Sequence, residues 1–198
     1  MLPEQFLNRM KQMLGDEFPA FLESYEQDKY QALRINPQKT TISSFMEKSP
    51  FSLKQVPWEK NGFYYQKTDA PGKHPYHAAG VYYIQEPSAM APAAYLEAQP
   101  GERVLDLCAA PGGKSTQIAA AMGGEGLLIS NEIHPARAKI LSENIERMGI
   151  RNGMVINESP QSLAKIFESY FDRIMVDAPC SGAVSYTHLR AHETEADL

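Results

Sequence analysis

Two short segments carry the residues best suited to chemistry. The first is Cys108-Ala109-Ala110-Pro111-Gly112-Gly113-Lys114, and the second is Asp177-Ala178-Pro179-Cys180-Ser181-Gly182. The two glycines of the first segment allow a ligand to approach the backbone closely. The helix expected after them would offer its free N–H groups to a carboxylate or a phosphate. The first segment is therefore a candidate anion-binding turn.

The second segment places an acid and a thiol close together in the chain. C5 of cytosine is a poor nucleophile until a thiolate adds to C6 of the ring, and a carboxyl group at N3 assists that addition. Asp177 and Cys180 therefore suit chemistry on a pyrimidine. The structural alternative makes Cys180 a small buried hydrophobic side chain and Asp177 a helix cap.

Both segments follow predicted strands in a β-α-β-α-β-α-β series. Strands are predicted at about 104–107, 126–130, 154–156 and 173–176, and helices at about 114–122, 135–148 and 161–168. This alternation is the signature of a parallel sheet covered by helices on both faces. Ligands of such sheets bind outside the carboxyl ends of the strands, which is where both segments are expected.

Glu132 ends the second predicted strand of this series. An acid roughly twenty residues after a Gly-rich turn commonly accepts hydrogen bonds from ribose hydroxyls, which favours a nucleoside ligand. The alternative is that Gly112-Gly113 is only a tight turn and Glu132 only a solvated carboxylate.

A nucleotide-triphosphate P-loop is a further alternative. Residues 108–115 match G-x-x-x-x-G-K-[ST] except at the first position, where Cys108 replaces glycine. Pro111 also removes one N–H group that could contact a phosphate. This alternative predicts Mg-ATP binding, whereas Glu132 favours a nucleoside ligand.

The region before the sheet has a different pattern. Apolar residues at helical spacing predict a helix after Pro3 that stops near Gly15, and a second helix beginning near Phe18. Short strands are expected from about Ala32, and residues 57–83 read as loops and short strands. We therefore expect a small α+β domain over residues 1–95, followed by a partial sheet domain over residues 96–182.

Composition narrows the protein class. The chain has 198 residues, of which 43% are hydrophobic and 22% charged, as in ordinary globular proteins. It contains no apolar run of about eighteen residues and no signal peptide, so we expect a cytoplasmic protein without membrane contact. Two cysteines without zinc-ligand spacing predict no metal site. The net charge of −5 argues weakly against nucleic-acid binding but does not exclude a local basic patch.

Several of these segments together resemble one family. Residues 106–115 with residues 177–182 closely resemble the RNA 5-methylcytosine methyltransferases of the NOL1/NOP2/Sun family. Leu33-Arg34-Ile35-Asn36, residues 71–77 and residues 83–90 look like the bacterial branch that modifies 16S ribosomal RNA. The resemblance covers residues 1 to 182.

The resemblance implies a Rossmann-like class I methyltransferase sheet, cut after its fourth strand and preceded by a small α+β domain. S-adenosylmethionine would be the cofactor, with Cys108 to Lys114 around its methionine and ribose side and Glu132 on the ribose hydroxyls. Asp177 would border both the cofactor and the target base. The partner would be RNA, namely 16S rRNA or the small ribosomal subunit. The family often has another acid near the adenine, but the sequence here is Asn157-Glu158-Ser159, which leaves the role of Glu158 open.

The family also divides catalytic labour between two cysteines. Cys180 corresponds to the one that helps to resolve the covalent adduct, whereas the attacking nucleophile lies in a later Thr-Cys or Ser-Cys motif. No cysteine follows Cys180 in this chain. The resemblance therefore implies an inactive fragment of a methyltransferase. A fragment that binds cofactor or RNA without turnover is the non-enzymatic alternative.

After Gly182 the chain departs from the family pattern. Residues 183–198 look like the in-frame translation of a transposon-end sequencing adapter, so we expect them to be an artefactual tail. The alternative is a natural frameshift or a divergent terminus. Raw sequencing reads that run continuously across the Gly182 codon into this tail would contradict the artefact hypothesis.

Overall fold

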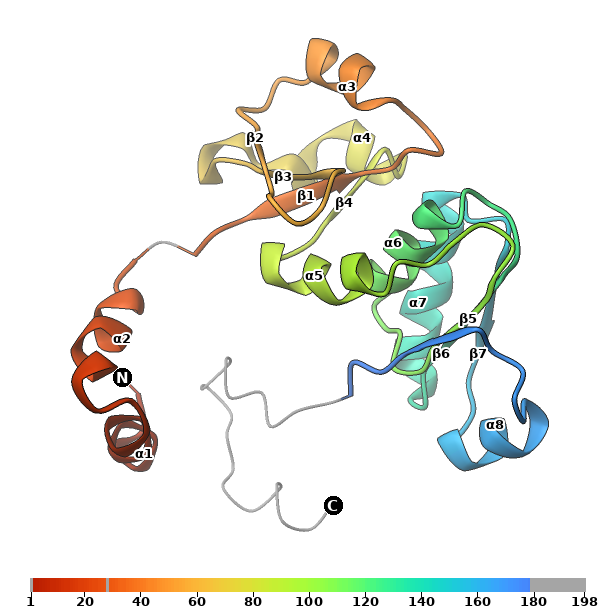
Figure 1. Cartoon of the computed structure of the whole chain (residues 1–198). Helices are drawn as coiled ribbons and strands as arrows, with labels where there is room; N and C mark the ends of the chain where they lie inside the picture. The colour runs from red at the N-terminus through yellow and green to blue at the C-terminus, as the bar shows by residue number, and fades with distance from the viewer. Residues whose placement is uncertain (1, 28, 179–198) are drawn as a thin grey trace. The chain divides into compact units, whose positions relative to one another are not determined.

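The computed structural model describes residues 2–27 and 29–178, and Figure 1 traces their elements. The described residues form two compact units, one before Tyr30 and one from Tyr30 to Ala178. Cys180 and the expected tail at 183–198 lie outside the described residues. No helix among the described residues is long and apolar enough to cross a membrane.

The first unit is helical, as predicted. It contains α1 (Glu4–Leu14), a 3-10 turn (Gly15–Glu17) and α2 (Phe18–Ser24). The rings of Phe6 and Phe21 lie 6.1 Å apart, so the apolar stripes of the two helices meet. Phe21 also packs edge-on against Tyr25 at 5.2 Å.

The second unit begins with an antiparallel sheet. Its strands are β1 (Ala32–Ile35), β2 (Lys54–Gln55), β3 (Gly62–Tyr64) and β4 (Tyr82–Ile84), in the order β2-β3-β1-β4. Every residue of the central strand β1 is buried, Arg34 included. Leu33, Ile35 and Tyr82 form the core of this part with Phe45 and Phe63.

Several helices of this region were not predicted. They are α3 (Ile42–Lys48), α4 (Pro75–Ala78), α5 (Pro87–Tyr95) and the 3-10 turns Lys67–Asp69 and Pro71–Lys73. The Thr41 hydroxyl caps α3 by accepting a hydrogen bond from the Ser44 N–H group. Pro87 occupies the first turn of α5, where a proline is tolerated, whereas Pro92 lies inside it. Proline and alanine leave α5 without a clear apolar stripe, so periodicity could not find it.

The parallel sheet follows as predicted, with boundaries that differ by one or two residues. Its strands are β5 (Arg103–Asp106), β6 (Leu127–Asn131), β7 (Gly153–Ile156) and β8 (Arg173–Met175). The connecting helices are α6 (Gly113–Ala121), α7 (Pro135–Met148) and α8 (Pro160–Ile166). All strand pairs are parallel and the order is β7-β6-β5-β8. The predicted α/β fold class is confirmed.

The direction of the strand order reverses at β5. From β5 the chain moves outward to β6 and β7, and it then returns through α8 to β8 on the other side of β5. A crevice opens at the carboxyl ends of the strands at such a reversal, and ligands of open α/β sheets bind there. Leu141 and Ile145 of α7 pack beneath Ala109 and Ala110, so the loop after β5 rests on an apolar support. The fold thus places the first candidate segment at the reversal point.

Residues 30–178 pack as one unit although they contain two sheets. Helix α5 contacts both β3 of the antiparallel sheet and α6 of the parallel sheet. The predicted division between residues 95 and 96 falls directly after α5 and stays a prediction.

Candidate functional site

The candidate site is built around the loop that joins β5 to α6. The Tyr83 hydroxyl donates a hydrogen bond of 3.4 Å to the Pro111 carbonyl of this loop. Four further side chains from other elements donate shorter hydrogen bonds to carbonyl groups of residues 107–113. They are Asn131 to Leu107 at 3.1 Å, Arg137 to Ala110 at 2.9 Å, Asn144 to Pro111 at 2.8 Å and Arg34 to Gly113 at 3.0 Å. We call these four side chains the carbonyl clamp. These side chains belong to β1, β6 and α7, so the backbone of the loop is held by residues that lie outside the loop.

The start of α6 provides hydrogen-bond donors. The N–H groups of Gly113, Lys114 and Ser115 belong to its first turn, where helix geometry supplies no acceptor. The Gly113–Lys114 peptide group is planar and trans, so the Gly113 carbonyl and the Lys114 N–H group point in opposite directions. The Ala110 carbonyl has no such partner, because it precedes Pro111 through a cis bond and proline carries no N–H group. An anion is stabilised at such a helix start by these N–H groups and by the helix dipole.

The two glycines of the loop have separate reasons to be glycine. Gly112 has a φ of 112°, which side chains of L-residues rarely adopt. Gly113 is limited by space instead, since a Cβ there would lie 3.3 Å from atoms of Tyr83 and of Gln85. Both neighbours come from β4 and the residue after it. The close approach at Gly113 in this structure is thus to protein atoms of the antiparallel sheet.

Asp106 is the buried acid at the end of β5. Its side chain is fully buried, and one carboxylate oxygen accepts a hydrogen bond from the Ser115 hydroxyl at 2.7 Å. The other oxygen has no hydrogen-bond partner among residues 2–27 and 29–178. Burial raises the pKa of Asp106 from 3.8 to about 6, against the opposing effects of the Ser115 hydrogen bond and the Lys114 charge. Asp106 links the end of β5 to the first turn of α6.

Glu132 lies directly after β6, on the neighbouring strand, as the sequence predicted. Its side chain is only 2% exposed. One carboxylate oxygen accepts the His134 N–H group at 3.0 Å, and the other lies 3.2 Å from the Arg137 guanidinium. Arg137 also belongs to the carbonyl clamp, so it ties Glu132 to the loop after β5.

Asp177 follows β8 on the other side of β5. One of its carboxylate oxygens lies 2.6 Å from the Lys114 ammonium group, so the two candidate segments meet through this ion pair. Asp177 remains about half exposed, whereas Lys114 is mostly buried. Cys180, its predicted partner, lies outside the described residues.

A cavity of about 240 Å³ lies beside the loop after β5, and of the three acids only Asp177 lines it. Its walls come from β4 and the start of α5, from the loop after β5 and from Asp177. Cys108 lines it, and burial, with the nearby carboxylates of Asp106 and Glu132, raises the pKa of the Cys108 thiol. Cys108 is therefore a neutral thiol at neutral pH and is not poised for nucleophilic attack.

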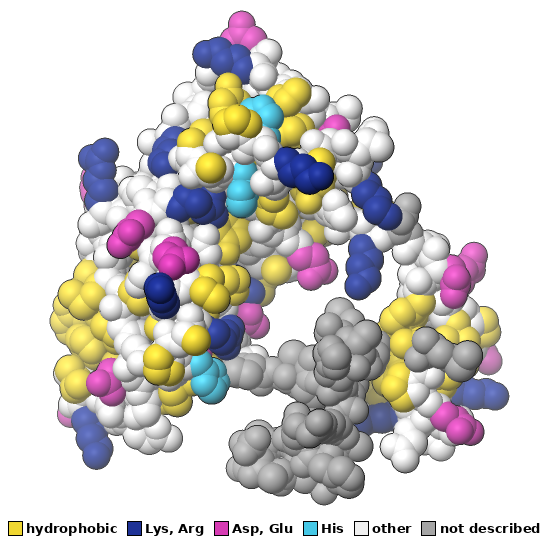
Figure 2. Space-filling model, turned by 180° about the vertical axis from the view of Figure 1, so that it is seen from behind, with side chains coloured by type: hydrophobic (Ala, Val, Ile, Leu, Met, Phe, Trp, Pro, Cys, Tyr) yellow, Lys and Arg dark blue, Asp and Glu magenta, His cyan; other side chains and the backbone are white. Residues whose placement is uncertain are grey.

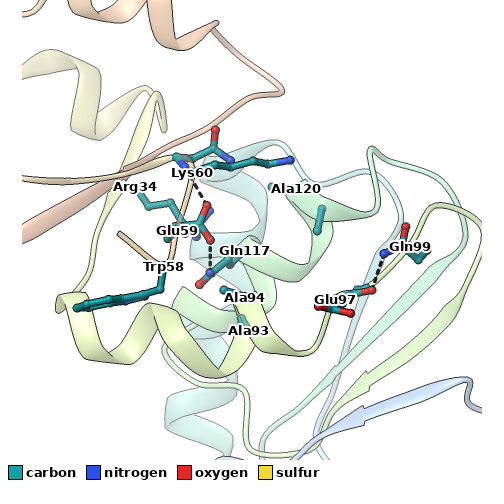
Figure 3. A pocket seen from close by; sticks show the side chains of 13 residues that line it. Arg34, Trp58, Glu59, Lys60, Ala93, Ala94, Glu97, Gln99, Gln117 and Ala120 are labelled. Carbon is teal, nitrogen blue, oxygen red and sulfur yellow. Dashed lines mark hydrogen bonds between the residues drawn. The ribbon is translucent and has the colours of Figure 1, made fainter. Parts of the chain in front are cut away.

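A larger cavity of about 420 Å³ lies elsewhere, between the antiparallel sheet and helices α5 and α6 (Figure 3). Arg34, Trp58 and Glu59 line it, and Gln117 of α6 donates a hydrogen bond to the Glu59 carboxylate. None of the residues predicted for the site lines this cavity. The larger cavity is therefore not the one that contains the predicted site residues. We assign the site to the smaller cavity because the start of α6 and the ends of the strands meet there.

Sequence reasoning missed the residues that hold the loop. Arg34 and Gln85 lie in segments that were noted only for their family resemblance, and Arg137 and Asn144 were not noted at all. The one signal for Arg34 in the sequence was the position of an arginine between apolar residues of a predicted strand, where a charged side chain is unusual. No group of three or more His, Cys, Asp or Glu side chains suited to a metal occurs in the part of the chain that the structure describes.

The raised pKa of Asp106 predicts a pH-dependent stability. Between about pH 4 and pH 6 the folded state holds a proton on Asp106 that the unfolded state has released, so stability falls as pH rises through this window. Relative to Asp106→Asn, the free energy of unfolding of the wild-type chain should fall by on the order of 2 to 3 kcal/mol from pH 4 to 7. Denaturant unfolding of both chains at several pH values measures this difference. Parallel pH profiles would contradict it.

The comparisons with known proteins agree along almost the whole chain. Residues 2–87 match the N-terminal domain of 16S rRNA methyltransferase RsmF, and residues 93–197 match 16S rRNA methyltransferase RsmB/F. Ribosomal RNA small subunit methyltransferase F of Vibrio vulnificus (strain YJ016) is 37% identical over 194 residues. The protein of the same name from Escherichia fergusonii is 36% identical over 191 residues. Each alignment covers 91% of this chain, which spans about 40% of the length of these relatives.

Solved structures of methyltransferases share the fold of this chain. A methyltransferase homologue from Pyrococcus horikoshii has a TM-score of 0.80 at 30% identity, over 92% of this chain and 61% of its own. NSun6 from Pyrococcus horikoshii, solved with SFG, has a TM-score of 0.82 at 16% identity, over 96% of this chain and 75% of its own, and so shares the fold. The predicted Rossmann-like methyltransferase fold and the predicted family are confirmed. The chain belongs to the RsmB/F family of 16S rRNA methyltransferases.

Proposed function

We propose that this chain is the cofactor-binding part of an enzyme that methylates C5 of a cytosine in 16S rRNA. S-adenosylmethionine is the cofactor of the family and supplies the methyl group. The observation that carries the proposal is the position of the loop after β5. It presents the first turn of α6 at the reversal of the strand order, beside Asp177 at the end of β8.

The residues present fit this cofactor. The free N–H groups of the first turn of α6 suit the methionine carboxylate, and Lys114 adds a positive charge beside them. Cys108 to Pro111, with Gly113, line the 240 Å³ cavity and are proposed to face the methionine and ribose side. Each carboxylate oxygen of Glu132 makes one contact and retains a lone pair that a ribose hydroxyl could use. Glu158 is exposed and receives no role here.

Asp177 suits a role at the target base. Lys114 holds its carboxylate at the edge of the cavity, and the half-exposed side chain leaves room for a second partner. From there a carboxyl group can assist thiolate addition to C6 by a hydrogen bond at N3 of cytosine. Cys180 is proposed to help resolve the adduct. The family resemblance assigns the attacking thiolate to a later cysteine, and no cysteine follows Cys180 in this sequence.

A basic surface on the antiparallel sheet suits the RNA partner. Residues 30–84 contain seven Lys and Arg but only three Asp and Glu, whereas the whole chain has a net charge of −5. All six of these lysines are exposed. Figure 2 shows Lys and Arg side chains around the upper part of the molecule, which holds this sheet. The charge of the chain is thus unevenly distributed, as phosphate contacts require.

Cofactor binding is tested by calorimetric titration of the 198-residue chain with S-adenosylhomocysteine and, separately, with Mg-ATP. We expect S-adenosylhomocysteine alone to bind. Gly113→Asp should abolish binding, because its side chain would press on Tyr83 and Gln85 and would repel the ligand carboxylate.

Ala164→Asp is the control for the added charge, since Ala164 is exposed in α8 and lines neither cavity. It should leave the dissociation constant unchanged. Binding of Mg-ATP alone would overturn the methyltransferase proposal in favour of a P-loop, and binding of neither ligand would contradict a competent cofactor site in this chain.

RNA contact is tested by neutralising exposed lysines. The triple variant Lys48→Gln, Lys54→Gln, Lys60→Gln should weaken binding of transcribed 16S rRNA. The plot of log association constant against log salt concentration, which has a negative slope, should become less steep by about 2. A control triple variant, Lys139→Gln, Arg151→Gln, Lys165→Gln, changes exposed side chains of the α7–α8 region. Equal losses in both variants would contradict an RNA surface on the antiparallel sheet.

A further inference from the structure

The antiparallel sheet contributes one buried cation to the β5–α6 loop. Arg34 lies in the central strand β1 and is only 1% exposed. One of its terminal nitrogens donates hydrogen bonds to the Gly113 carbonyl at 3.0 Å and to the Thr116 hydroxyl at 2.7 Å. Its Nε atom donates to the Gln85 side-chain oxygen at 3.2 Å. One guanidinium group therefore joins β1, the end of β4 and the first turn of α6.

Gln85 extends this contact to the other side of Gly113. Its amide nitrogen donates to the Ala89 carbonyl at 3.0 Å, which anchors it to α5. A Cβ at Gly113 would lie 3.3 Å from its amide group. Arg34 thus donates to the Gly113 carbonyl. Gln85, which accepts another hydrogen bond from Arg34, covers the Cα of Gly113.

The burial of Arg34 carries a cost. Burial lowers the pKa of Arg34 to about 10, with a partial opposing effect from Glu59, so the side chain still carries its charge at neutral pH. Its other terminal nitrogen has no hydrogen-bond partner within residues 2–27 and 29–178. Figure 3 shows the side chains of Arg34 and Glu59 near Gln117 of α6. Because a buried charge often adds little to the stability of a fold, the hydrogen-bond geometry of Arg34 tells more about its role than its burial does.

We propose that Arg34 is a positioning residue for the cofactor, acting through the peptide group between Gly113 and Lys114. By holding the Gly113 carbonyl it turns the Lys114 N–H group in the opposite direction, as one of the donors of the first turn of α6. The antiparallel sheet then does more than contact RNA, because it completes the cofactor site of the parallel sheet. This inference rests on the proposed cofactor function.

Lysine cannot replace Arg34 in this role. A guanidinium is a planar fork that reaches two acceptors in fixed directions, whereas an ammonium is a single point charge. Arg34→Lys keeps the charge and loses either the contact to Gln85 or the contacts to Gly113 and Thr116. Thr116→Val leaves the arginine in place but removes one of its acceptors and also the hydrogen bond from the Thr116 hydroxyl to the Gly113 carbonyl.

Asn36 provides the matched control. Asn36 directly follows β1 and is as deeply buried as Arg34. Its side chain donates to the Gly80 carbonyl at 2.9 Å and to the Met148 carbonyl at 2.8 Å. It therefore joins the antiparallel sheet to the end of α7 without touching the β5–α6 loop. Asn36→Ala should cost stability as Arg34→Lys does but should not move the start of α6.

The test uses the full chain and two measurements. Calorimetric titration with S-adenosylhomocysteine should give a dissociation constant about tenfold weaker for Arg34→Lys, about threefold weaker for Thr116→Val and within about twofold of wild type for Asn36→Ala. Amide hydrogen exchange without ligand should show faster exchange at Thr116 and Gln117 in Arg34→Lys than in Asn36→Ala, because their acceptors are the Gly112 and Gly113 carbonyls.

The outcomes separate the two proposals. If wild type fails to bind, the cofactor function falls, and the exchange measurement still decides whether Arg34 orders the start of α6. If Arg34→Lys and Asn36→Ala lose affinity and protection equally, at equal stability by denaturant unfolding, Arg34 has only a structural role and the inference is overturned. Wild-type affinity in Arg34→Lys would overturn it as well.

Discussion

The candidate site depends on how the carbonyl groups of the β5–α6 loop are held. The four side chains of the carbonyl clamp come from β1, β6 and α7, all outside the loop. A short Gly-rich loop has little rigidity of its own. Its conformation is therefore a property of the whole unit from Tyr30 to Ala178.

Charge at the site is arranged around the same loop. Asp106 is buried beneath the first turn of α6, Lys114 lies above it, and Asp177 pairs with Lys114 at the edge of the cavity. The reversal of strand order at β5 brings these groups together, because β6 and β8 both end beside β5. The same topology places Glu132 on the far side, tied to the loop through Arg137. The fold thus positions two cations, Lys114 and Arg137, among three carboxylates around the loop after β5.

The sequence predicted the parallel sheet well because its strands and helices have clear periodicity, as in α7 with Leu141, Ile145 and Met148 on one face. It placed Asp177 and the segment after β5 at strand ends for the same reason, and the roles of these residues stay a prediction. It missed α5, where proline and alanine hide the helix, and it missed the contact of Arg34 with Gly113. That contact joins residues 79 positions apart in the chain, and no local pattern encodes such a distance. The spacing of residues in a motif therefore predicts the β5–α6 loop but not the distant side chains that hold it.

The central claim is that the cofactor binds at the start of α6, in the smaller of the two cavities. The most direct test is a titration of the ¹⁵N-labelled chain with S-adenosylhomocysteine, followed through the amide signals. The largest shifts are expected at Gly113, Lys114 and Glu132, with the Trp58 indole signal unchanged. Shifts centred on Trp58 and Gln117, which line the larger cavity, would contradict the account.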